Sequence, residues 1–599
     1  DVKRVIDRAA HEGDRFFTVA LPAFGKDFEQ ALRRGEIDSD LFRGWSRKGS
    51  PKVHRETPVF LGSLIDRVFD SETGWILSEP CADSVQAIRQ LTLAFGKLKE
   101  LCPPEKIQAE YRNYLRTDEE LHAHCEKFWE DGSKALQILE NLQQTVRVLF
   151  GTPLSALDSD IWSFDVMPKH GPGATADRKM GNQKYDQHEW PVRMEQLFPF
   201  LEYAVPTRDP SFLEGVEFLP YEDERPVKLT AVPKDANRPR LIAEEPTCMQ
   251  YMQQAVSRRL TKYLQSERIR GTRNYCYELL GFEHQWPNQA MAQIGSEDGS
   301  LATLDLSEAS DRVPNWLVDE LFADFPWFCE ALSVTRSRRV SIPDLGEFDL
   351  SKFASMGSAL TFPVEAMVFL TIVVKTVLSG SVEDVRPVDP NQVLRLRDRV
   401  RIYGDDIIVP VDSAEAVVHS LETLGFKVNV NKSFWTGQFR ESCGKEYFAG
   451  EDVSIVRFRR ALPTRPPLPH RDATDVVTTV ATRNQFYEAG YWATAACLDE
   501  VLEKVLKGAY PFVGPDSPVL GRRSFLHGYD THGVSSDLQS PLVRGFVERS
   551  KPPANAAENY AALLKCLLIN GDANTESDHL LRSGRPRVVS IKRGMARPY

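Results

Sequence analysis

The stretch that decides the fold is Leu394-Arg-Leu-Arg-Asp-Arg-Val-Arg-Ile-Tyr-Gly-Asp-Asp-Ile-Ile-Val-Pro410. Apolar and charged residues alternate through its first half, and this period of two predicts a half-buried strand over residues 394–402. Residues 407–409 are a second, β-branched run. Between the runs, Gly404 and Asp405 form a two-residue turn, and glycine at the first position suits a type II′ hairpin. The sequence therefore predicts a hairpin with two adjacent carboxylates at its tip.

The two carboxylates at this tip, Asp405 and Asp406, have two interpretations. Adjacent unpaired carboxylates repel each other, so the pair makes physical sense when a divalent cation sits on it. Gly-Asp turns are nevertheless common, because Asp forms local hydrogen bonds in turns. The hairpin alone does not decide between a catalytic tip and a structural turn.

The bulk composition is that of a soluble globular protein, with 599 residues, 42% apolar and 27% charged. The net charge of -11 does not indicate a nucleic-acid binder, although a basic groove can exist locally. Nine scattered cysteines without a Cys-x-x-Cys pair favour reduced thiols. The chain starts without a signal-peptide pattern, and its apolar run at 366–374 is too short to span a bilayer. We expect a soluble intracellular protein.

A further carboxylate follows the apolar run 301–304, which predicts a short strand ending at Asp305. The next helix begins near Pro314, where Asp311 can cap it, so Asp305 is left without a structural role. Phosphoryl transfer to a 3′-hydroxyl uses two cations about 4 Å apart, which need carboxylates from different chain segments. We expect Asp305 and Asp405 at neighbouring strand ends of one antiparallel sheet, with Mg²⁺ as the ion.

Three further segments have a chemical interpretation beside a structural one. Residues 228–246 carry spaced Lys and Arg on extended, Pro-punctuated backbone, which fits either a triphosphate contact or a solvated loop. Residues 355–361 are a small-residue loop that would let a sugar or base pair approach the backbone. Residues 169–177 contain Gly-Pro-Gly, where freed amides could meet phosphate or form a plain turn.

The rest of the chain supplies the frame. Helical periodicity or start and stop signals predict helices at 84–101, 133–150, 249–264, 363–378, 413–424, 495–506 and 555–568. Short strands are expected at 338–342, 347–350 and 426–430, with a further pair around a turn in 439–448. The basic, Pro-rich stretch 457–471 marks a lobe boundary, beyond which we expect mostly helix and a loosely ordered basic tail at 582–597.

Taken in order, these segments resemble the palm of viral RNA-dependent RNA polymerases. More narrowly they resemble the replicases of positive-strand RNA bacteriophages (leviviruses), with narnavirus-like polymerases as near relatives. The resemblance covers about residues 168–450 and rests on Leu304-Asp-Leu-Ser-Glu-Ala-Ser-Asp311 (motif A), Ser355-Met-Gly357 through Thr361 and Glu365 (motif B), Tyr403-Gly-Asp-Asp406 (motif C), Gly425-Phe through Lys432 (motif D), Val232-Pro-Lys234 through Arg240 (motif F), Arg440-Glu-Ser-Cys-Gly-Lys445 and His170-Gly-Pro-Gly-Ala-Thr175.

The resemblance implies an α+β right-hand polymerase of fingers, palm and thumb, in which an antiparallel palm sheet carries the Gly-Asp-Asp hairpin. By position, residues 1–300 would be an N-terminal region and fingers, with motif F at about 228–246. Residues 301–455 would be the palm, with a fingers insertion at about 325–352. Residues 456–599 would be the thumb and the basic tail.

The resemblance also implies roles for individual residues. Metal ligands would be Asp305, Asp405 and Asp406, with Leu306 beside them. Lys432 would be the general acid for pyrophosphate, with Lys427 as the rival. Residues that bind the nucleotide would be Lys234, Arg238, Arg240, Ser310, Asp311, Ser355, Gly357, Thr361 and Glu365.

Two positions depart from the family pattern. Many related polymerases place a second motif A Asp where this chain has Ser310, and Asp311 stands one residue further, so either could bind the ribose 2′-hydroxyl. Glu365 stands where many families carry Asn. A reverse transcriptase would share the metal carboxylates, but it would place a bulky aromatic residue after the motif A Asp.

The implied activity is template-directed RNA synthesis that replicates a viral genome in the host cytoplasm. NTPs would be joined to an RNA 3′-hydroxyl with release of pyrophosphate, using two Mg²⁺ ions, with Mn²⁺ as a substitute. The implied partners are RNA template and product, host translation elongation factors and a ribosomal protein, and no membrane. A non-enzymatic RNA-binding protein is the alternative, but it leaves unexplained three carboxylates that would repel polyanionic RNA.

Overall fold

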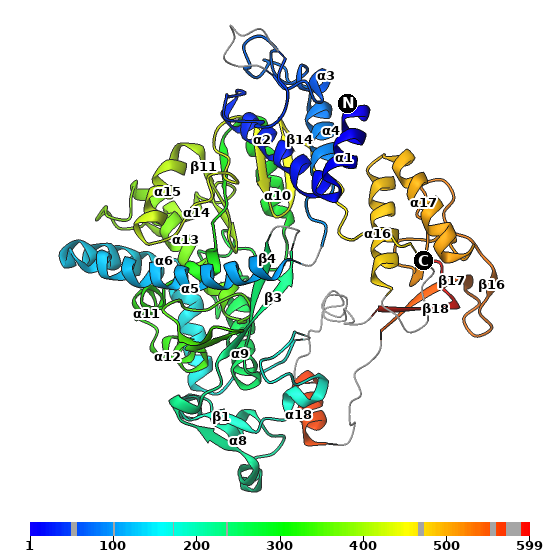
Figure 1. Ribbon diagram of the computed structural model, residues 1–599. Helices are drawn as coiled ribbons and strands as arrows, with labels where there is room; N and C mark the ends of the chain where they lie inside the picture. The colour runs from blue at the N-terminus through cyan, green and yellow to red at the C-terminus, as the bar shows by residue number, and fades with distance from the viewer. Residues whose placement is uncertain are drawn as a thin grey trace.

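The computed structural model describes residues 1–48, 57–99, 102–171, 173–234, 238–464, 473–550, 559–570 and 589–599. The structure contains both helices and antiparallel sheets, which confirms the α+β class. The described part of the first 162 residues is mostly helical, and its helices are α1 (Val2–Glu12), α2 (Leu21–Arg34), α3 (Gly62–Ile65), α4 (Ala82–Leu93), α5 (Pro104–Trp129) and α6 (Gly132–Trp162). Figure 1 shows α5 and α6 running beside the middle of the chain, where α6 packs on α9, α12 and α13.

Two of the predicted N-terminal helices have different ends in the structure. The helix expected at 84–101 stops at Leu93 as α4. The helix expected at 133–150 continues to Trp162 as α6, with Pro153 inside it. Leu154, Leu157 and Ile161 are all buried in the largest core cluster, so packing of this extra segment outweighs the proline.

A three-stranded antiparallel sheet lies at the centre, in the order β10 (Arg401–Tyr403), β11 (Asp406–Pro410), β7 (Leu301–Leu304). Its two faces bury alternate residues. Leu301 and Ile408 pack with Met291 of α10 (Trp286–Asp298). Ile407 and Val409 face the core that contains α13 (Thr361–Ser379). Covering both faces fixes the register, because a slip of one residue would exchange the two faces.

Two predicted strands are formed only in small part. Of the strand expected at 394–402, only β10 exists, because α14 (Pro390–Leu394) starts behind an Asp389 cap and Asp398 adopts a left-handed φ of 58°. Leu396, Val400 and Ile402 are still buried, so the alternation marked burial and not strand. In the strand expected at 426–430, only Val428 forms a bridge, to Leu306, and the chain then turns toward Asp305.

A second sheet has the order β4 (Pro239–Glu244), β3 (Val227–Pro233), β8 (Arg339–Ile342), β9 (Gly346–Asp349). The predicted hairpin of β8 and β9 is confirmed, and it joins β3 through a short parallel pairing. The predicted helices around the two sheets are also present, as α9 (Thr247–Leu264), α11 (Asn315–Leu321), α13 and α15 (Ala414–Thr423), together with α12 (Pro326–Thr335). The strands expected in 439–448 are β12 (Phe439–Ser442) and β13 (Lys445–Phe448), followed by β14 (Glu451–Asp452).

Short elements complete the region before the central sheet. They are η1 (Phe16–Ala20), η2 (Gly181–Tyr185), β1 (Glu189–Pro191), α7 (Val192–Leu197), α8 (Phe200–Tyr203), η3 (Pro210–Gly215), β2 (Glu217–Leu219), η4 (Tyr221–Asp223), β5 (Arg268–Ile269) and β6 (Thr272–Arg273). Two further single turns, η5 (Ala309–Arg312) and η6 (Val411–Ser413), follow β7 and β11. Helix α13 is long and apolar enough to cross a membrane, but 83% of its apolar stretch is buried inside the protein.

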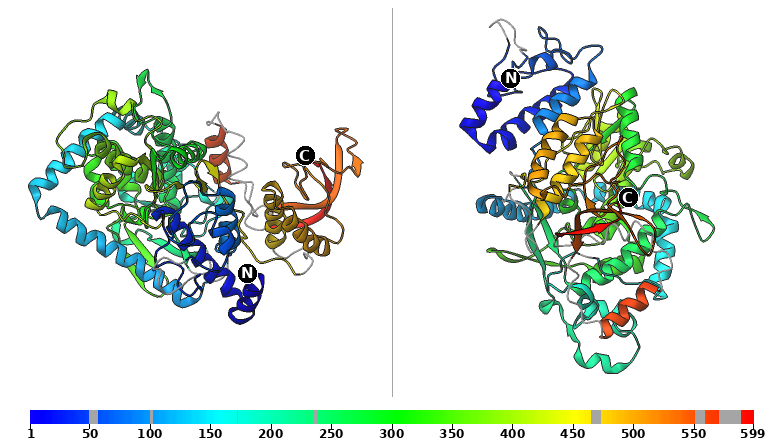
Figure 2. Two further views of the ribbon diagram at one scale, coloured as in Figure 1. Left: turned by 90° about the horizontal axis from the view of Figure 1, so that it is seen from above. Right: turned by 90° about the vertical axis from the view of Figure 1, so that its right-hand side faces the viewer.

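The last part of the chain forms a separate lobe (Figures 1 and 2). It contains α16 (Thr474–Glu488), α17 (Trp492–Leu506), β15 (Val519–Leu520), β16 (Gly533–Val534), β17 (Pro541–Ser550) and β18 (Val589–Ala596). The expectation of a mostly helical region is therefore wrong for these strands. The expectation of a loosely ordered tail is also wrong from residue 589, because β18 pairs along β17. Residues 582–588 lie outside the described residues. Helix α18 (Tyr560–Asn570) packs instead on η2, where Lys565 donates to Asn182 over 3.0 Å.

Candidate active site

The predicted hairpin is present at the tip of the central sheet. Tyr403 pairs with Asp406, so Gly404 and Asp405 are the two turn residues. Gly404 has a φ of +63° and Asp405 does not have a positive φ, which is the type II′ pattern. A Cβ on Gly404 would lie 2.3 Å from Cε2 of Phe362, so this position requires glycine on packing grounds as well.

Asp305 lies at the end of β7, next to this tip. Ile407 pairs with Leu304, and the same register continued by one residue sets Asp406 opposite Asp305. Burial raises the pKa of Asp305, and repulsion from Asp405 adds to the increase. The structure thus brings Asp305 next to Asp405 and Asp406, which lie a hundred residues further along the sequence.

A second set of contacts holds Asp305 from the side of residues 429–433. Lys432 Nζ lies 3.2 Å from Asp305 Oδ2, and the Asn429 amide donates to the same oxygen over 3.1 Å. Burial lowers the pKa of Lys432, but attraction to Asp305 and neighbouring carboxylates outweighs it, so the net shift is upward. Lys427 is exposed, and its carbonyl accepts from the Ser307 amide. Of the two rivals, only Lys432 contacts a carboxylate of the site.

Asp406 is held by β12 and the turn after it. Its Oδ1 accepts from the backbone N–H of Cys443 over 3.1 Å and from the Ser442 hydroxyl over 3.4 Å. Burial, with repulsion from Asp405 and Asp305, raises the pKa of Asp406 to about 6. Asp405 is exposed at the tip and faces solvent. Asp406 is less exposed and is held by these hydrogen bonds.

The chemistry of these side chains fits a divalent cation. In the part of the chain that the structure describes, no group of three or more His, Cys, Asp or Glu side chains is already arranged as a metal site. The carboxylates of Asp305, Asp405 and Asp406 nevertheless repel one another, and the Lys432 ammonium partly offsets that charge. Carboxylate oxygens are the donors that hard divalent cations prefer. The side chain of Leu306 is buried in the core, so only its backbone could contribute a ligand.

The small-residue loop before α13 is packed inside the protein. The Ser355 hydroxyl is 2.7 Å from the Tyr114 hydroxyl, and the Thr361 hydroxyl donates to the Ser355 carbonyl over 2.8 Å. Gly357 has a φ of +141°, and a Cβ there would lie 1.8 Å from the Ala243 carbonyl oxygen. The small residues therefore let the backbone of β4 approach this loop, which positions the loop beside the site.

Asp311 and Glu365 share one environment with the hairpin. Glu365 is 6% exposed, and its Oε2 has no hydrogen-bond partner in the described part of the chain. Burial, then repulsion from Asp405 and Asp311, raises the pKa of Glu365 well above its usual range. Asp311 is 23% exposed, while Ser310 is half-buried on η5. Asp311 therefore lies close enough to Glu365 and the hairpin for their charges to repel.

The basic residues predicted to bind a triphosphate lie on the other sheet. Lys234 follows β3, and Arg238 and Arg240 stand at the start of β4; residues 235–237 between them lie outside the described residues. Arg238 is 77% exposed and lies 3.7 Å from Glu110. The Ala243 amide of β4 donates to the Met356 carbonyl over 2.8 Å, which connects this basic hairpin to the loop before α13.

The residues around the Gly-Pro-Gly segment are held by contacts to the core; Pro172 itself lies outside the described residues. His170 is buried between the rings of Tyr185 and Tyr251. Lys184 Nζ donates to the Gly171 carbonyl over 2.8 Å, and the Ala176 amide donates to the Glu245 carbonyl over 2.9 Å. These contacts place the segment beneath the junction of β4 and α9.

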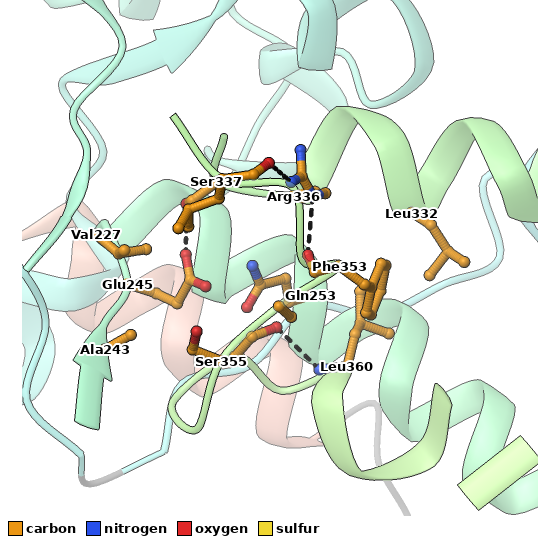
Figure 3. Close-up of a pocket in the computed structure, with 13 residues that line it drawn as sticks. Val227, Ala243, Glu245, Gln253, Leu332, Arg336, Ser337, Phe353, Ser355 and Leu360 are labelled. Carbon is orange, nitrogen blue, oxygen red and sulfur yellow. Dashed lines mark hydrogen bonds between the residues drawn. The ribbon is translucent and has the colours of Figure 1, made fainter. Parts of the chain in front are cut away.

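A small internal cavity lies next to this junction (Figure 3). It has room for about one water molecule and none for a nucleotide. Glu245 points toward Ser337, whose hydroxyl donates to it over 2.5 Å, and the Arg336 side chain donates to the Phe353 carbonyl over 2.9 Å. Burial raises the pKa of Glu245 to about 7. The cavity is therefore part of the packing that supports the site.

Sequence reasoning missed one buried residue beside the site. Lys352 has no exposed surface and lies 3.7 Å from Asp311 and 4.0 Å from Asp118 of α5. No local pattern around Lys352 marks it as buried. The helical spacing of Tyr111, Tyr114 and Asp118 is the signal that could have shown α5 to have a buried face.

Comparison with known proteins identifies the region that carries this geometry. The family model "RNA replicase, beta-chain" matches residues 214–469. The match contains the central sheet, the hairpin and the basic segment.

Residues 214–469 are thus similar to the RNA replicase beta-chain family.

Curated proteins are also similar to parts of this chain. The chain is 32% identical over 326 residues to the RNA-directed RNA polymerase subunit beta of Qbeta virus (strain MX1), covering 54% of this chain and 48% of that protein. It is 35% identical over 232 residues to the RNA-directed RNA polymerase beta chain of Enterobacteria phage fr, covering 39% and 37%. The alignments thus span about half or less of these relatives. The resemblance to RNA-bacteriophage replicases is confirmed.

Solved structures show a weaker likeness to this chain. The RNA-dependent RNA polymerase of a human picorbirnavirus is 12% identical with a TM-score of 0.34, covering 67% of this chain and 81% of that one. An RdRp complex is 12% identical with a TM-score of 0.38, covering 78% and 43%. These values are too low to assign residues.

Proposed function

We propose that the chain is an RNA-dependent RNA polymerase that joins NTPs to an RNA 3′-hydroxyl under the direction of an RNA template. The observation that carries the proposal is the meeting of Asp305 with Asp405 and Asp406 at adjacent strand ends, inside the region that matches the replicase family. A binding protein for RNA has no use for three carboxylates that repel phosphate. A metal-dependent nucleotidyl transferase requires them.

The carboxylates would hold divalent cations, and we propose two Mg²⁺ ions, with Mn²⁺ as a substitute. When bound, such ions lower the charge on the reacting phosphate and orient the attacking 3′-hydroxyl. Asp406, anchored by the Cys443 amide, and the exposed Asp405 would hold these ions together with Asp305. A backbone ligand at Leu306 would complete the set.

The remaining residues would bind the nucleotide or move a proton. Lys234, Arg238 and Arg240 are on the exposed rim of the second sheet and would neutralise the triphosphate. Lys432 Nζ carries a proton next to Asp305 and would pass it to the leaving pyrophosphate. Asp311 would receive the ribose 2′-hydroxyl, with Glu365 behind it. Ser355, Gly357 and Thr361 would act by positioning the loop before α13.

The parts of the right hand are assigned on the same basis. Residues 301–455, with the central sheet, would be the palm, and the insertion at about 325–352 would belong to the fingers with residues 1–300. Residues 456–599 would be the thumb and the basic tail, in keeping with the separate lobe in Figure 1. As a replicase of this type, the chain would act in the host cytoplasm, with RNA and with host translation elongation factors and a ribosomal protein.

The test is primer extension by the purified chain on a generic RNA template with Mg²⁺, with and without host extract. We expect RNA products that require the template, and ribonucleotides used far better than deoxyribonucleotides. Comparable incorporation of both sugars would favour the reverse-transcriptase alternative. Template binding without extension under both conditions would favour the non-enzymatic alternative.

A further inference from the structure

One face of α5 packs against the segments that carry the site. Asn113 and Thr117 both donate to the Glu308 carboxylate, over 2.9 and 3.4 Å. The Tyr114 hydroxyl is 2.7 Å from the Ser355 hydroxyl. Spacings of three and four residues put these side chains on one side of the helix. Helix α5 lies outside the residues that match the replicase family, so the match gives it no role.

Lys352 occupies the centre of this contact. Its side chain is fully buried, and Nζ lies 3.5 Å from the centroid of the Tyr114 ring and 3.3 Å from the Tyr114 carbonyl oxygen. Nζ is also 3.7 Å from Asp311 Oδ1 and 4.0 Å from Asp118 Oδ1. Burial lowers the pKa of Lys352, and attraction to the Asp311 and Asp118 carboxylates opposes that shift. The lysine thus links α5 to motif A.

The two carboxylates around Lys352 are held very differently. Asp118 accepts hydrogen bonds from the backbone amides of Ser351 and Lys352 over 2.9 and 3.0 Å, so it is fixed without the ammonium. Asp311 Oδ1 is buried and has no hydrogen-bond partner among the described residues. Lys352 is the one described cation within 4.0 Å of Asp311. The orientation of Asp311 therefore depends on Lys352.

A buried charge of this kind is a poor stabiliser, because desolvation offsets the attraction, but it defines position well. We propose that Lys352 is a positioning residue that sets the Asp311 carboxylate toward the ribose of the incoming nucleotide, with α5 as its anchor. The inference rests on the proposed polymerase function. It adds a lysine and a helix, neither of them expected to touch substrate, to the part of the site that selects the sugar.

The test compares ATP with dATP as substrates for single-nucleotide extension by the full chain. Lys352→Met keeps the length of the side chain and removes its charge. We expect the ATP-to-dATP ratio of kcat/KM to fall about tenfold, because a hydrogen bond to a charged group is lost for ATP alone. The loss should be seen mainly as a higher KM for ATP, with kcat for dATP unchanged. Lys352→Arg, which keeps the charge, should recover part of the ratio.

The control is Glu119→Gln, which removes a carboxylate next to Asp118 on the exposed face of α5 and should leave the ratio unchanged. If Lys352→Met does not fold, as judged by thermal melting, the double variant Lys352→Met/Asp118→Asn removes the uncompensated charge and is measured instead. A wild-type ratio in the variant that folds overturns the positioning role. Failure of both to fold also overturns it, because the lysine is then structural. Absence of extension by the wild-type chain counts against the proposed function itself.

Discussion

Two hairpins carry the charges that we propose for the site, and they are built in opposite ways. The β10–β11 hairpin has a two-residue turn, and both faces of its sheet are covered. Its carboxylates Asp405 and Asp406 lie next to Asp305. The β3–β4 hairpin presents exposed cations, among them Arg238 at 77% exposure. We propose that the carboxylate half of the site is preorganised and that the exposed cationic half adjusts to its ligand. Preorganised charge is where catalysis gains most.

The largest expected effect tests the preorganised half. Asp305→Asn keeps the shape of the strand end but removes the charge opposite Asp406. Extension should fall by roughly 10³-fold or more, since several kcal/mol of transition-state stabilisation depend on the ligand set. Asp398→Asn is the matched control, because residue 398 is exposed and its left-handed φ of 58° suits asparagine. Single-turnover extension measures both; equal rates for the two variants would remove Asp305 from the site.

A smaller effect is expected at Lys432, whose ammonium contacts Asp305. Lys432→Met should lower kcat by about 10²-fold if the ammonium protonates pyrophosphate, because general acid catalysis contributes about that much. Lys427→Met should have little effect, since Lys427 contacts no carboxylate of the site in the structure. The measurement is the rate constant of single-turnover extension. A larger loss for Lys427→Met than for Lys432→Met would make Lys427 the acid.

The adaptable half should respond in binding more than in rate. Arg240→Met should raise KM for NTPs about tenfold with a smaller change in kcat, because a charge-assisted contact to phosphate is lost. Arg399→Met removes an exposed arginine outside the site and serves as the control. A large fall in kcat at unchanged KM would show that the β3–β4 hairpin is as preorganised as the other.

The smallest effect is on stability. The pKa of Asp406 is raised to about 6 from about 4 in the unfolded chain, so the folded protein takes up a proton between these values and loses stability as pH rises through them. Without metal, Asp406→Asn should increase the free energy of unfolding by about 1–3 kcal/mol at pH 7.5, and by much less at pH 4. Urea midpoints at both pH values measure this. A variant less stable than wild type at pH 7.5 would show that Asp406 is a structural turn residue.

The sequence predicted those parts of the structure whose signals are local and missed those that depend on distant contacts. Glycine at 404 and the β-branched run after it encode the hairpin locally, and the short strand before Asp305 is equally local, so both predictions are confirmed. The alternation at 394–402 failed because an Asp389 cap and a left-handed Asp398 redirect the chain, and tertiary burial alone explains the pattern. The contact of Lys352 with α5 joins residues more than two hundred positions apart, and no single-sequence signal reports such a pair. Pairing of β18 with β17 was missed for the same reason.

The most direct test of the central claim is extension of a primed RNA template by Asp405→Asn with Mg²⁺, measured beside Asp398→Asn and wild type. The exposed Asp405 has no structural partner that the substitution would disturb within the described hairpin, so folding and most of the RNA affinity should persist. The account predicts no detectable nucleotide incorporation by Asp405→Asn and wild-type rates for the control. Extension by Asp405→Asn at a rate close to wild type would contradict the assignment of this hairpin as the metal-binding centre.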